Sequence, residues 1–175
     1  MNIQLVINLD DVRAFLVGDL NLADGYLTTA CFEAQEIGLK QILGGALLAA
    51  LKTDCAAATH TARMTALADA CRLYMAYETI AYAIPKVTHK VGNMGAIQST
   101  DDKATGLGKA DTDALVEEWQ TKADYFAYEL QVWLLDNEAD YPELRADGIR
   151  ANLLSMASCG IWLGGPRGRK NYGTR

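Results

Sequence analysis

The run Gly106-Leu107-Gly108-Lys109 comes closest in this sequence to a phosphate-binding loop. Such a loop holds phosphates with backbone N–H groups and a lysine. Its pattern is Gly-x-x-x-x-Gly-Lys followed by Ser or Thr, which would require a glycine at position 103 and a Ser or Thr at position 110. Lys103 and Ala110 occupy these two positions here. The run therefore does not predict a nucleotide site.

Acid–base and metal chemistry find equally little support. The two histidines are His60, just before a predicted helix, and His89, in a segment between helices, so neither is well placed as a catalytic base. Glu33 and Glu36 share a predicted helix face, but a di-metal carboxylate bundle also needs Glu-x-x-His pairs, and the chain has none. We interpret the two glutamates as a solvated acidic face, and we expect no catalytic residue, metal or cofactor.

The cysteines follow no ligand spacing. They are separated by 24, 16 and 88 residues, with no Cys-x-x-Cys pair: Cys31, Cys55, Cys71 and Cys159. A zinc site needs ligands that lie closer together in the sequence. Small, buried thiols in a reducing compartment are the expected state.

The hydrophobic pattern predicts a mainly α protein, a bundle of about four to five helices. Residues 2–9 alternate apolar and polar side chains, which predicts an N-terminal strand. A short helix capped by Asp10 or Asp11 should follow, then a helix from about Ala23 that kinks at Gly44-Gly45. The longest uncharged apolar run, Ile42 to Leu51, is ten residues, about half of what a bilayer requires. We therefore expect no membrane contact.

Two long helices should form the core. The first spans Thr61 to Ile84, is apolar on two faces, and should end at Pro85 because the residue before a proline avoids helical geometry. The second begins at a cap at Asp111 or Thr112, carries the stripe Leu115, Trp119, Phe126, Leu130 and Trp133, and ends near Asn137 and Pro142. A last helix is predicted over 149–161.

The segment Lys86 to Ala110 separates the two long helices. At 25 residues it is far longer than the usual connection of about 4–6 residues. Its first half, Lys86 to Ser99, alternates Val87, His89 and Val91 before Gly92-Asn93, which predicts a projecting β-hairpin. Its second half, 100–110, is polar and predicts a flexible connection back to the second long helix. We expect a single domain over 1–163 with this hairpin/loop insert at 86–110.

Charge is segregated along the chain. Residues 1–163 carry 12 basic and 22 acidic side chains, a net charge of −10, whereas the tail 164–175 carries four basic side chains and no acid. An acidic body disfavours gripping nucleic acid over the whole surface, because such binding relies on neutralising phosphates. The basic tail could contact phosphate, pair with an acidic partner surface, or stay solvated.

The order of these pieces resembles the head-to-tail connector (adaptor) proteins of tailed bacteriophages. The matching residues begin with Glu33-Ala34-Gln35-Glu36 and the leucine-rich continuation from Leu39 through Gly44 to Leu51. They continue with the tyrosine-rich helix Tyr74 to Tyr82, which runs into Val87-Thr88 and Gly92. They end with the aromatic helix that closes near Tyr141-Pro142. The resemblance covers roughly residues 10–145.

The resemblance implies a non-enzymatic structural protein of the virion neck, assembled in the host cytoplasm. Its partners would be further copies of itself in a dodecameric ring, the portal protein, and other neck or tail proteins. Packaged double-stranded DNA would pass through the ring, and an acidic body would leave that passage unattractive to it. A helix that is apolar on two faces would suit lateral packing in a closed ring.

We assign hypothetical contacts to this ring. Lateral contacts would come from aromatic side chains of the two long helices: Tyr74, Tyr77, Trp119, Tyr125 and Tyr128. Axial contacts, by strand pairing or arm docking, would come from the insert and the tail: Lys86, Val87, His89, Lys90, Val91, Asn93, Met94, Ile97, Arg167, Arg169, Lys170, Tyr172 and Arg175. Three alternatives stay open: a helical regulatory or nucleic-acid-binding module that uses the basic tail, a small enzyme or metal protein, and another virion or scaffold protein.

Overall fold

The computed structural model describes residues 5–15, 24–57, 60–92, 95–98 and 109–146, with the backbone alone for 87–92, 95–98, 109 and 146. The protein is mainly helical, as the sequence predicts. Its elements are α1 (Leu9–Ala14), α2 (Asp24–Glu33), the π-helix η1 (Ala34–Leu39), α3 (Lys40–Cys55), α4 (Ala62–Thr88), β1 (His89–Gly92), β2 (Gly95–Gln98), α5 (Lys109–Asp136), the 3-10 turn η2 (Glu138–Asp140) and α6 (Glu143–Ala146).

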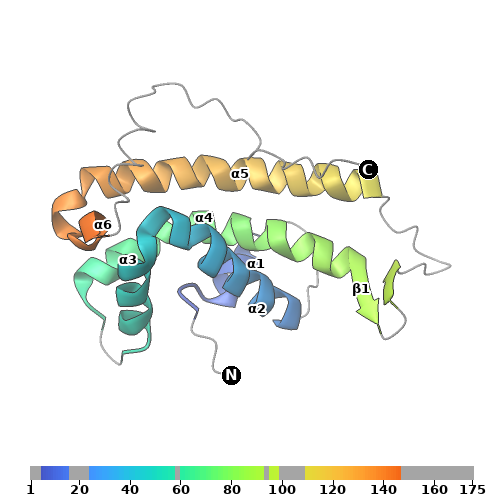
Figure 1. Cartoon of the computed structure of the whole chain (residues 1–175), viewed down its shortest axis with the longest axis horizontal. Coiled ribbons are helices and arrows are strands. Elements are labelled where there is room, and N and C mark those ends of the chain that lie inside the picture. Colours follow the sequence, from blue (N-terminus) through green and yellow to red (C-terminus); the bar gives the residue numbers. More distant parts are fainter. Residues whose placement is uncertain (1–4, 16–23, 58–59, 93–94, 99–108, 147–175) are drawn as a thin grey trace.

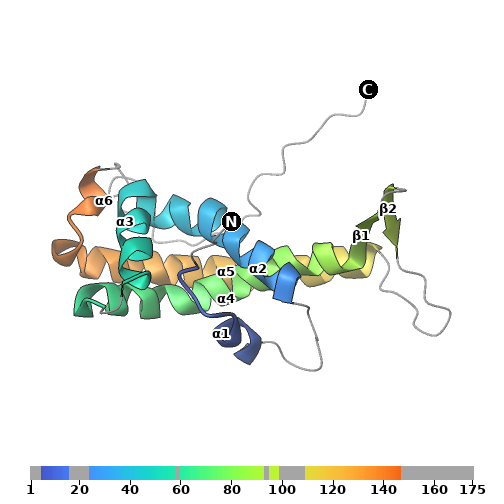
Figure 2. The same cartoon turned by 90° about the horizontal axis from the view of Figure 1, so that it is seen from below.

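The central element is α4. The long helix α5 runs antiparallel along it, while α1, α2 and η1 pack against α4 from other sides (Figures 1 and 2). Of the two apolar faces predicted for this helix, the first, formed by Met64, Leu67, Cys71 and Tyr74, is buried, and Ile80 and Ile84 of the second are buried too. Leu73, in contrast, is 38% exposed. The chain's own helices therefore cover most of both faces of α4.

The N-terminal strand prediction is wrong for the residues that the structure describes. Residues 5–8 form no strand, and helix α1 already begins at Leu9 with Asn8, rather than Asp10 or Asp11, as its cap. Asn8 Oδ1 accepts a hydrogen bond from the Asp10 N–H at 3.1 Å. Ile7 is buried on the helical core. The alternating apolar side chains of this irregular segment pack against helices and do not belong to a strand.

A single long stretch, α2–η1–α3, contains two local departures from α-helical geometry. Residues 34–39 are π-helical. At Gly44 the backbone has φ 80° and ψ 169°, a conformation that is open almost solely to glycine. The predicted kink at Gly44-Gly45 is thus confirmed, and α3 continues beyond it to Cys55.

Both long helices extend beyond their predicted ends. Helix α4 continues through Pro85 to Thr88, because Ile84 is buried and Lys86 is ion-paired, so tertiary contacts outweigh the local preference of the residue before proline. Helix α5 begins at Lys109, which places the predicted cap residue Thr112 inside the helix, where it is buried.

Within the segment Lys86–Ser99, β1 and β2 form a short antiparallel pair. Its register joins His89 with Gln98, Lys90 with Ile97, Val91 with Ala96, and Gly92 with Gly95. The pair lies at the end of the molecule where α4 finishes and α5 starts (Figure 1). The second half of the predicted insert, the predicted helix 149–161 and the basic tail lie outside the described residues, apart from the start of α5.

Candidate interaction surface

An aromatic cluster joins α1, α4 and α5. The ring of Tyr77 stacks on Phe126, with centroids 5.0 Å apart and planes at 15°, and it lies 5.5 Å from Trp119 and 6.0 Å from Phe15. Tyr125 meets Phe126 edge-on at 5.2 Å. Offset stacking and edge-on contacts are the favoured geometries of aromatic pairs. The cluster therefore fixes how α5 lies on α4.

The burial of these rings corrects part of the predicted lateral surface. Tyr74 is fully buried and Trp119 is 8% exposed, so both are used inside the chain and are inaccessible to a neighbouring subunit in this conformation. Tyr77 and Tyr128 are half-buried, and Tyr125 is 50% exposed. Of the five predicted lateral residues, Tyr125 is the one most available for an outside contact.

A buried polar cluster lies between η1, α4 and α5. The Glu78 side chain is fully buried, and its Oε2 accepts a hydrogen bond from Gln120 Nε2 at 2.9 Å. The same amide reaches Asp124 Oδ1 at 3.3 Å. Gly38 of η1 lies so close that a Cβ there would overlap the Tyr74 hydroxyl. The π-helix thus brings η1 against α4 at a point where no side chain fits.

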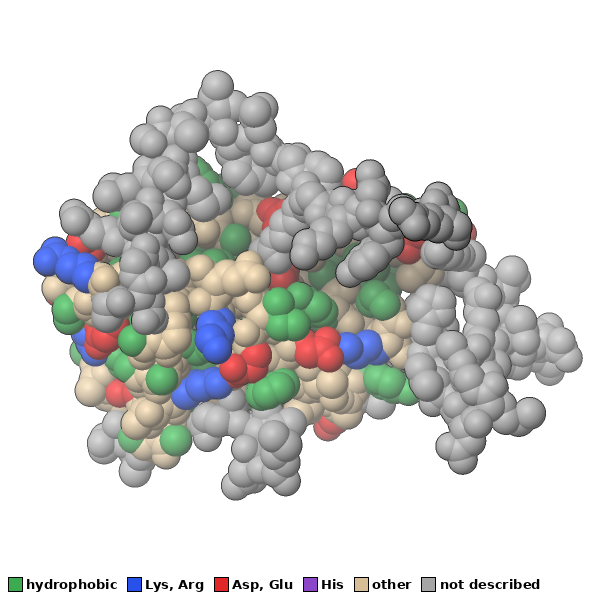
Figure 3. Space-filling view, viewed as in Figure 1, with side chains coloured by type: hydrophobic (Ala, Val, Ile, Leu, Met, Phe, Trp, Pro, Cys, Tyr) green, Lys and Arg blue, Asp and Glu red, His purple; other side chains and the backbone are tan. Residues whose placement is uncertain are grey.

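Two half-buried ion pairs attach neighbouring elements to α2 and η1. Glu33 pairs with Lys86 of α4 at 2.7 Å, and Glu36 pairs with Lys52 of α3. The hydrogen bond from Lys52 is the main reason that the pKa of the Glu36 carboxyl is lowered. The predicted solvated acidic face is therefore wrong, because both carboxylates have cationic partners. On the face in Figure 3, acidic and basic side chains alternate between hydrophobic ones and form no patch of one sign.

This pairing also changes the expected role of Lys86. As an axial contact it would face outward, but its ammonium group is held by Glu33. Among the other predicted axial residues, Val87 lies in α4, His89, Lys90 and Val91 lie in β1, and Ile97 lies in β2. Asn93, Met94 and the tail residues Arg167, Arg169, Lys170, Tyr172 and Arg175 lie outside the described residues.

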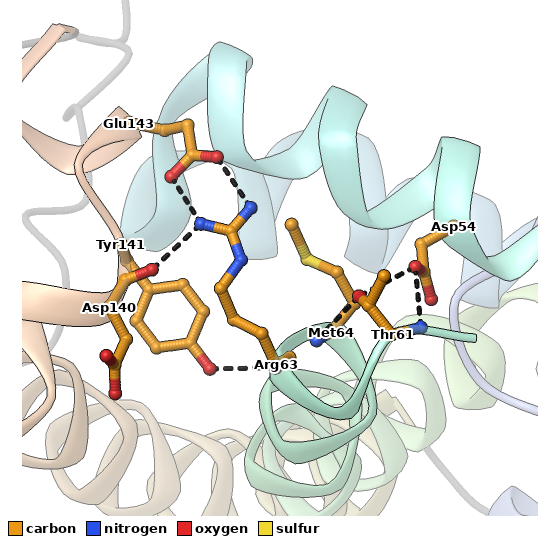
Figure 4. A network of polar contacts seen from close by, with 7 residues as sticks. All are labelled: Asp54, Thr61, Arg63, Met64, Asp140, Tyr141 and Glu143. Atoms are coloured by element: carbon orange, nitrogen blue, oxygen red, sulfur yellow. Dashed lines mark hydrogen bonds and ion pairs between the residues drawn. The ribbon is translucent and has the colours of Figure 1, made fainter.

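At the opposite end of α4, a polar clamp holds the chain that follows α5 (Figure 4). The Arg63 guanidinium binds both carboxylate oxygens of Glu143, at 2.8 and 3.1 Å, and the carbonyl of Asp140 at 2.8 Å. The Tyr141 hydroxyl donates to the Arg63 carbonyl at 2.9 Å. Because Arg63 stabilises the ionised form, the pKa of Glu143 is lowered.

His60 has a structural role in the turn before α4. Asp54 Oδ1 accepts hydrogen bonds from the Thr61 N–H at 3.0 Å and from the Thr61 hydroxyl at 2.9 Å, while His60 Nδ1 lies 3.4 Å from Asp54 Oδ2. Thr61 Oγ1 in turn accepts from the Met64 N–H at 3.4 Å, which caps the helix. His60 and Asp54 thus contact the start of a helix, with no serine or cysteine nucleophile among these contacts.

The cysteine thiols in the described residues are free. Burial raises the pKa of the Cys31 thiol to about 11, although the neighbouring Thr79 hydroxyl acts in the opposite direction. Burial also raises the pKa of the Cys71 and Cys55 thiols. Such thiols are poor nucleophiles and poor metal ligands at neutral pH, because the thiolate is the reactive form.

Sequence reasoning missed three exposed apolar side chains. Ile37 is 47% exposed, and Tyr26 and Leu73 are each 38% exposed. At regular α-helical spacing, Ile37 would continue the apolar stripe that begins at Leu27, but the π-helix adds residues per turn and rotates it outward. Nothing in the hydrophobic pattern marks Leu73 as different from its buried neighbours.

Across the described ranges, no three His, Cys, Asp or Glu side chains converge as metal ligands would. None of the helices in this part of the chain combines the length and apolar character that crossing a bilayer requires. What the described surface does offer is apolar side chains left exposed on four different helices. The fold and surface thus define a mainly helical protein with apolar contact positions around a core of two long helices.

The chain belongs to a family of unknown function, DUF6712, whose model matches residues 39–151. The match begins at the last residue of η1, covers α3 through α6, and leaves out α1, α2 and the basic tail. Comparisons with curated proteins and with solved structures gave no match.

Proposed function

We propose that this protein is a head-to-tail connector subunit of a tailed bacteriophage, which forms a ring beneath the portal and joins the capsid to the tail. The observation that carries the proposal is the position of the β1–β2 pair. It lies at one end of the antiparallel α4–α5 pair, where it is available as an arm toward an adjacent layer (Figure 1). Short exposed strands can bind an extended partner segment by adding a strand.

The surface chemistry supports the same role. Exposed apolar residues on separate helices, Ile37, Leu73 and Tyr125, give a subunit different patches for its two neighbours. A ring needs such heterologous contacts, in which one patch meets a different patch on the next copy. Residues 1–163 have a net charge of −10, which suits a passage through which DNA moves without binding.

The decisive measurement is the mass of the full-length protein in solution, alone and mixed with its portal protein, by native mass spectrometry and analytical ultracentrifugation. We expect a ring of about twelve copies, on its own or only when bound to the portal. A stable small oligomer that ignores the portal would refute the proposal.

The arm can be tested by a double substitution in the hairpin. Lys90→Glu with Ile97→Asp changes a cross-strand pair, and we expect it to reduce portal binding while the helical circular dichroism stays unchanged. Ala66→Glu is the matched control, since Ala66 is exposed near the other end of α4. Equal portal binding by both variants would remove the arm from the proposal.

A second candidate, a nucleic-acid-binding module, rests on the four basic residues of 164–175, which stand apart from the acidic remainder. It requires salt-sensitive binding of duplex DNA by the isolated protein, lost on deletion of 166–175. The connector requires no such binding. The same purified protein therefore separates the two functions.

A further inference from the structure

The outer face of α5 has no partner among the described elements, although its second half carries apolar side chains beside Asp124, Glu129 and Asp136. Helix α5 packs extensively only against α4. The buried residues of this half, Ala123, Ala127, Leu130 and Leu134, lie on the α4 side. Apolar side chains outside the face that packs on α4 are available to a further partner.

The uncovered stripe consists of Tyr125, Tyr128 and Val132, which are spaced i, i+3 and i+7 and therefore share one face. Tyr125 is 50% exposed, and the other two are half-buried. None of the three packs against the hydrophobic core, unlike Phe126 and Leu135 on the same helix. We call these three residues the outer stripe.

The charge around the outer stripe indicates what would cover it. Helix α5 carries seven acidic and two basic side chains, a net charge of −5. One of the two lysines, Lys122, is already held by Glu118 at 2.6 Å and lies over the Trp119 ring. A partner should therefore be apolar where it meets the outer stripe and basic where it meets the first half of α5.

Residues 149–175 of the same chain have this chemistry in this order. From Ile149 to Leu163 the one charged residue is Arg150, and the tail that follows carries Arg167, Arg169, Lys170 and Arg175. The described chain leaves α6 at Ala146, close to the C-terminal end of α5 (Figure 1). A chain that continues from Ala146 therefore sets out from the end of α5 nearest Val132.

The lengths also agree. The sequence predicts a helix over 149–161, which would be about 20 Å long. The ends of the outer stripe, Tyr125 and Val132, are separated by about 10 Å along α5, so such a helix is long enough to cover the whole stripe. Residues 164–170 can then span up to about 23 Å in extended form. That reach is long enough for the basic side chains to meet Glu117 and Glu118.

We propose that residues 149–175 lie antiparallel along α5, with the apolar residues of 149–161 on the outer stripe and the basic tail beside the acids of its first half. This inference is independent of the proposed function. It makes Tyr125 and Tyr128 inaccessible to a neighbouring subunit for as long as the segment is bound, so a ring contact through these residues requires the segment to leave.

Hydrogen exchange of the full-length protein, followed by peptide mass spectrometry, tests the proposal. We expect amides of 149–161 to exchange at least about tenfold more slowly than in an unstructured chain. Val132→Asp should abolish this protection and leave that of α4 intact. Ile37→Asp, at a position 47% exposed on η1, is the matched control and should change neither. Unprotected amides in the unmodified protein, or protection that survives Val132→Asp, would overturn the proposal.

Cross-linking provides a second measurement that does not depend on how well Val132→Asp folds. Tyr125→Cys should form an intramolecular disulfide with the native Cys159 under mild oxidation, whereas Ile37→Cys should not. Cys31 and Cys71 are buried, and the half-buried Cys55 is replaced by Ser in both variants, so that no other described thiol competes. Equal cross-linking of both variants would contradict the proposal.

Dilution tests whether the segment that covers α5 belongs to the same chain or to a second copy. Docking within one chain predicts protection that is unchanged over a hundredfold range of protein concentration. Protection that falls on dilution would show that the segment comes from a second copy, and it would overturn docking within the chain. Replacing Arg167, Arg169 and Lys170 by Glu should weaken the protection, because it reverses the charge facing the acids of α5.

Discussion

Gly38→Ala should destabilise the protein, because η1 and α4 approach each other more closely at this glycine than a methyl group permits. A Cβ at position 38 would overlap the Tyr74 hydroxyl, and it would lie 3.0 Å from Glu78 Oε1 and 3.3 Å from Tyr74 Cζ. Both Tyr74 and Glu78 are fully buried. Neither side chain can move toward solvent without opening the core.

The magnitude follows from two opposing effects. Overpacking a well-packed interior typically costs about 1–3 kcal/mol. Replacing a helical glycine by alanine returns up to about 1 kcal/mol. Since the overlap involves a buried ring, we expect a net loss of about 2 kcal/mol in the free energy of unfolding, which for a chain of this length lowers Tm by about 4–8 °C.

The assay is urea unfolding followed by far-ultraviolet circular dichroism, with Gly25→Ala as the matched control. Gly25 lies in α2 and a Cβ there meets nothing within 4 Å, so this change should be neutral or stabilising by up to about 1 kcal/mol. Measured in a Tyr74→Phe background, Gly38→Ala should cost at least about 1 kcal/mol less, because the overlapping oxygen is gone. A stable Gly38→Ala protein, or the same loss in both backgrounds, would refute the reasoning.

Three further outcomes are expected. Gly44→Ala should lower the unfolding free energy by about 1–3 kcal/mol, since φ 80° and ψ 169° strain any other residue, and denaturant titration measures it. Glu143→Gln should cost about 1 kcal/mol at pH 7, a value reduced for the partial exposure of Arg63. The pKa of Glu143 is lowered in the fold, so its contribution to stability is present above the unfolded pKa of about 4.3 and disappears as the pH falls through the folded value. In urea titrations, the difference in unfolding free energy between the unmodified protein and Glu143→Gln should therefore be smaller at pH 3 than at pH 7. Maleimide should not label Cys31 in the native protein at pH 8, because the thiol is buried and its pKa is raised to about 11; rapid native labelling would contradict this.

The helical part of the fold could be predicted well from the sequence because long amphipathic periods leave a strong signal. The core positions Met64 to Tyr74 and the break at Gly44 followed from spacing and from glycine's conformational freedom. The predicted helix ends were less accurate. Pro85 is a local signal, and it was outweighed by the burial of Ile84 and by an ion pair with a residue 53 positions away.

Features that depend on tertiary contact could not be predicted from the pattern. The π-helix occupies six residues, too few to show a period of its own, yet it exposes Ile37 and brings Gly38 against Tyr74. For the candidate surface, aromatic residues indicated contact positions on α4 and α5. Which of them face outward was decided by packing, which buries Tyr74 and leaves Tyr125 exposed.

The pairing of Lys86 with Glu33 bears on the role proposed for the β1–β2 pair. Lys86 lies three residues before β1, so the ion pair fixes the end of α4 that leads into β1. Helix α2 is thereby attached to α4 close to the start of β1. A partner that binds the strands would meet a base held by α2, not a freely hinged one, and less conformational freedom would be lost on binding. In the proposed ring, axial contacts would then begin at His89, and Lys86 would hold the arm in position without touching the partner.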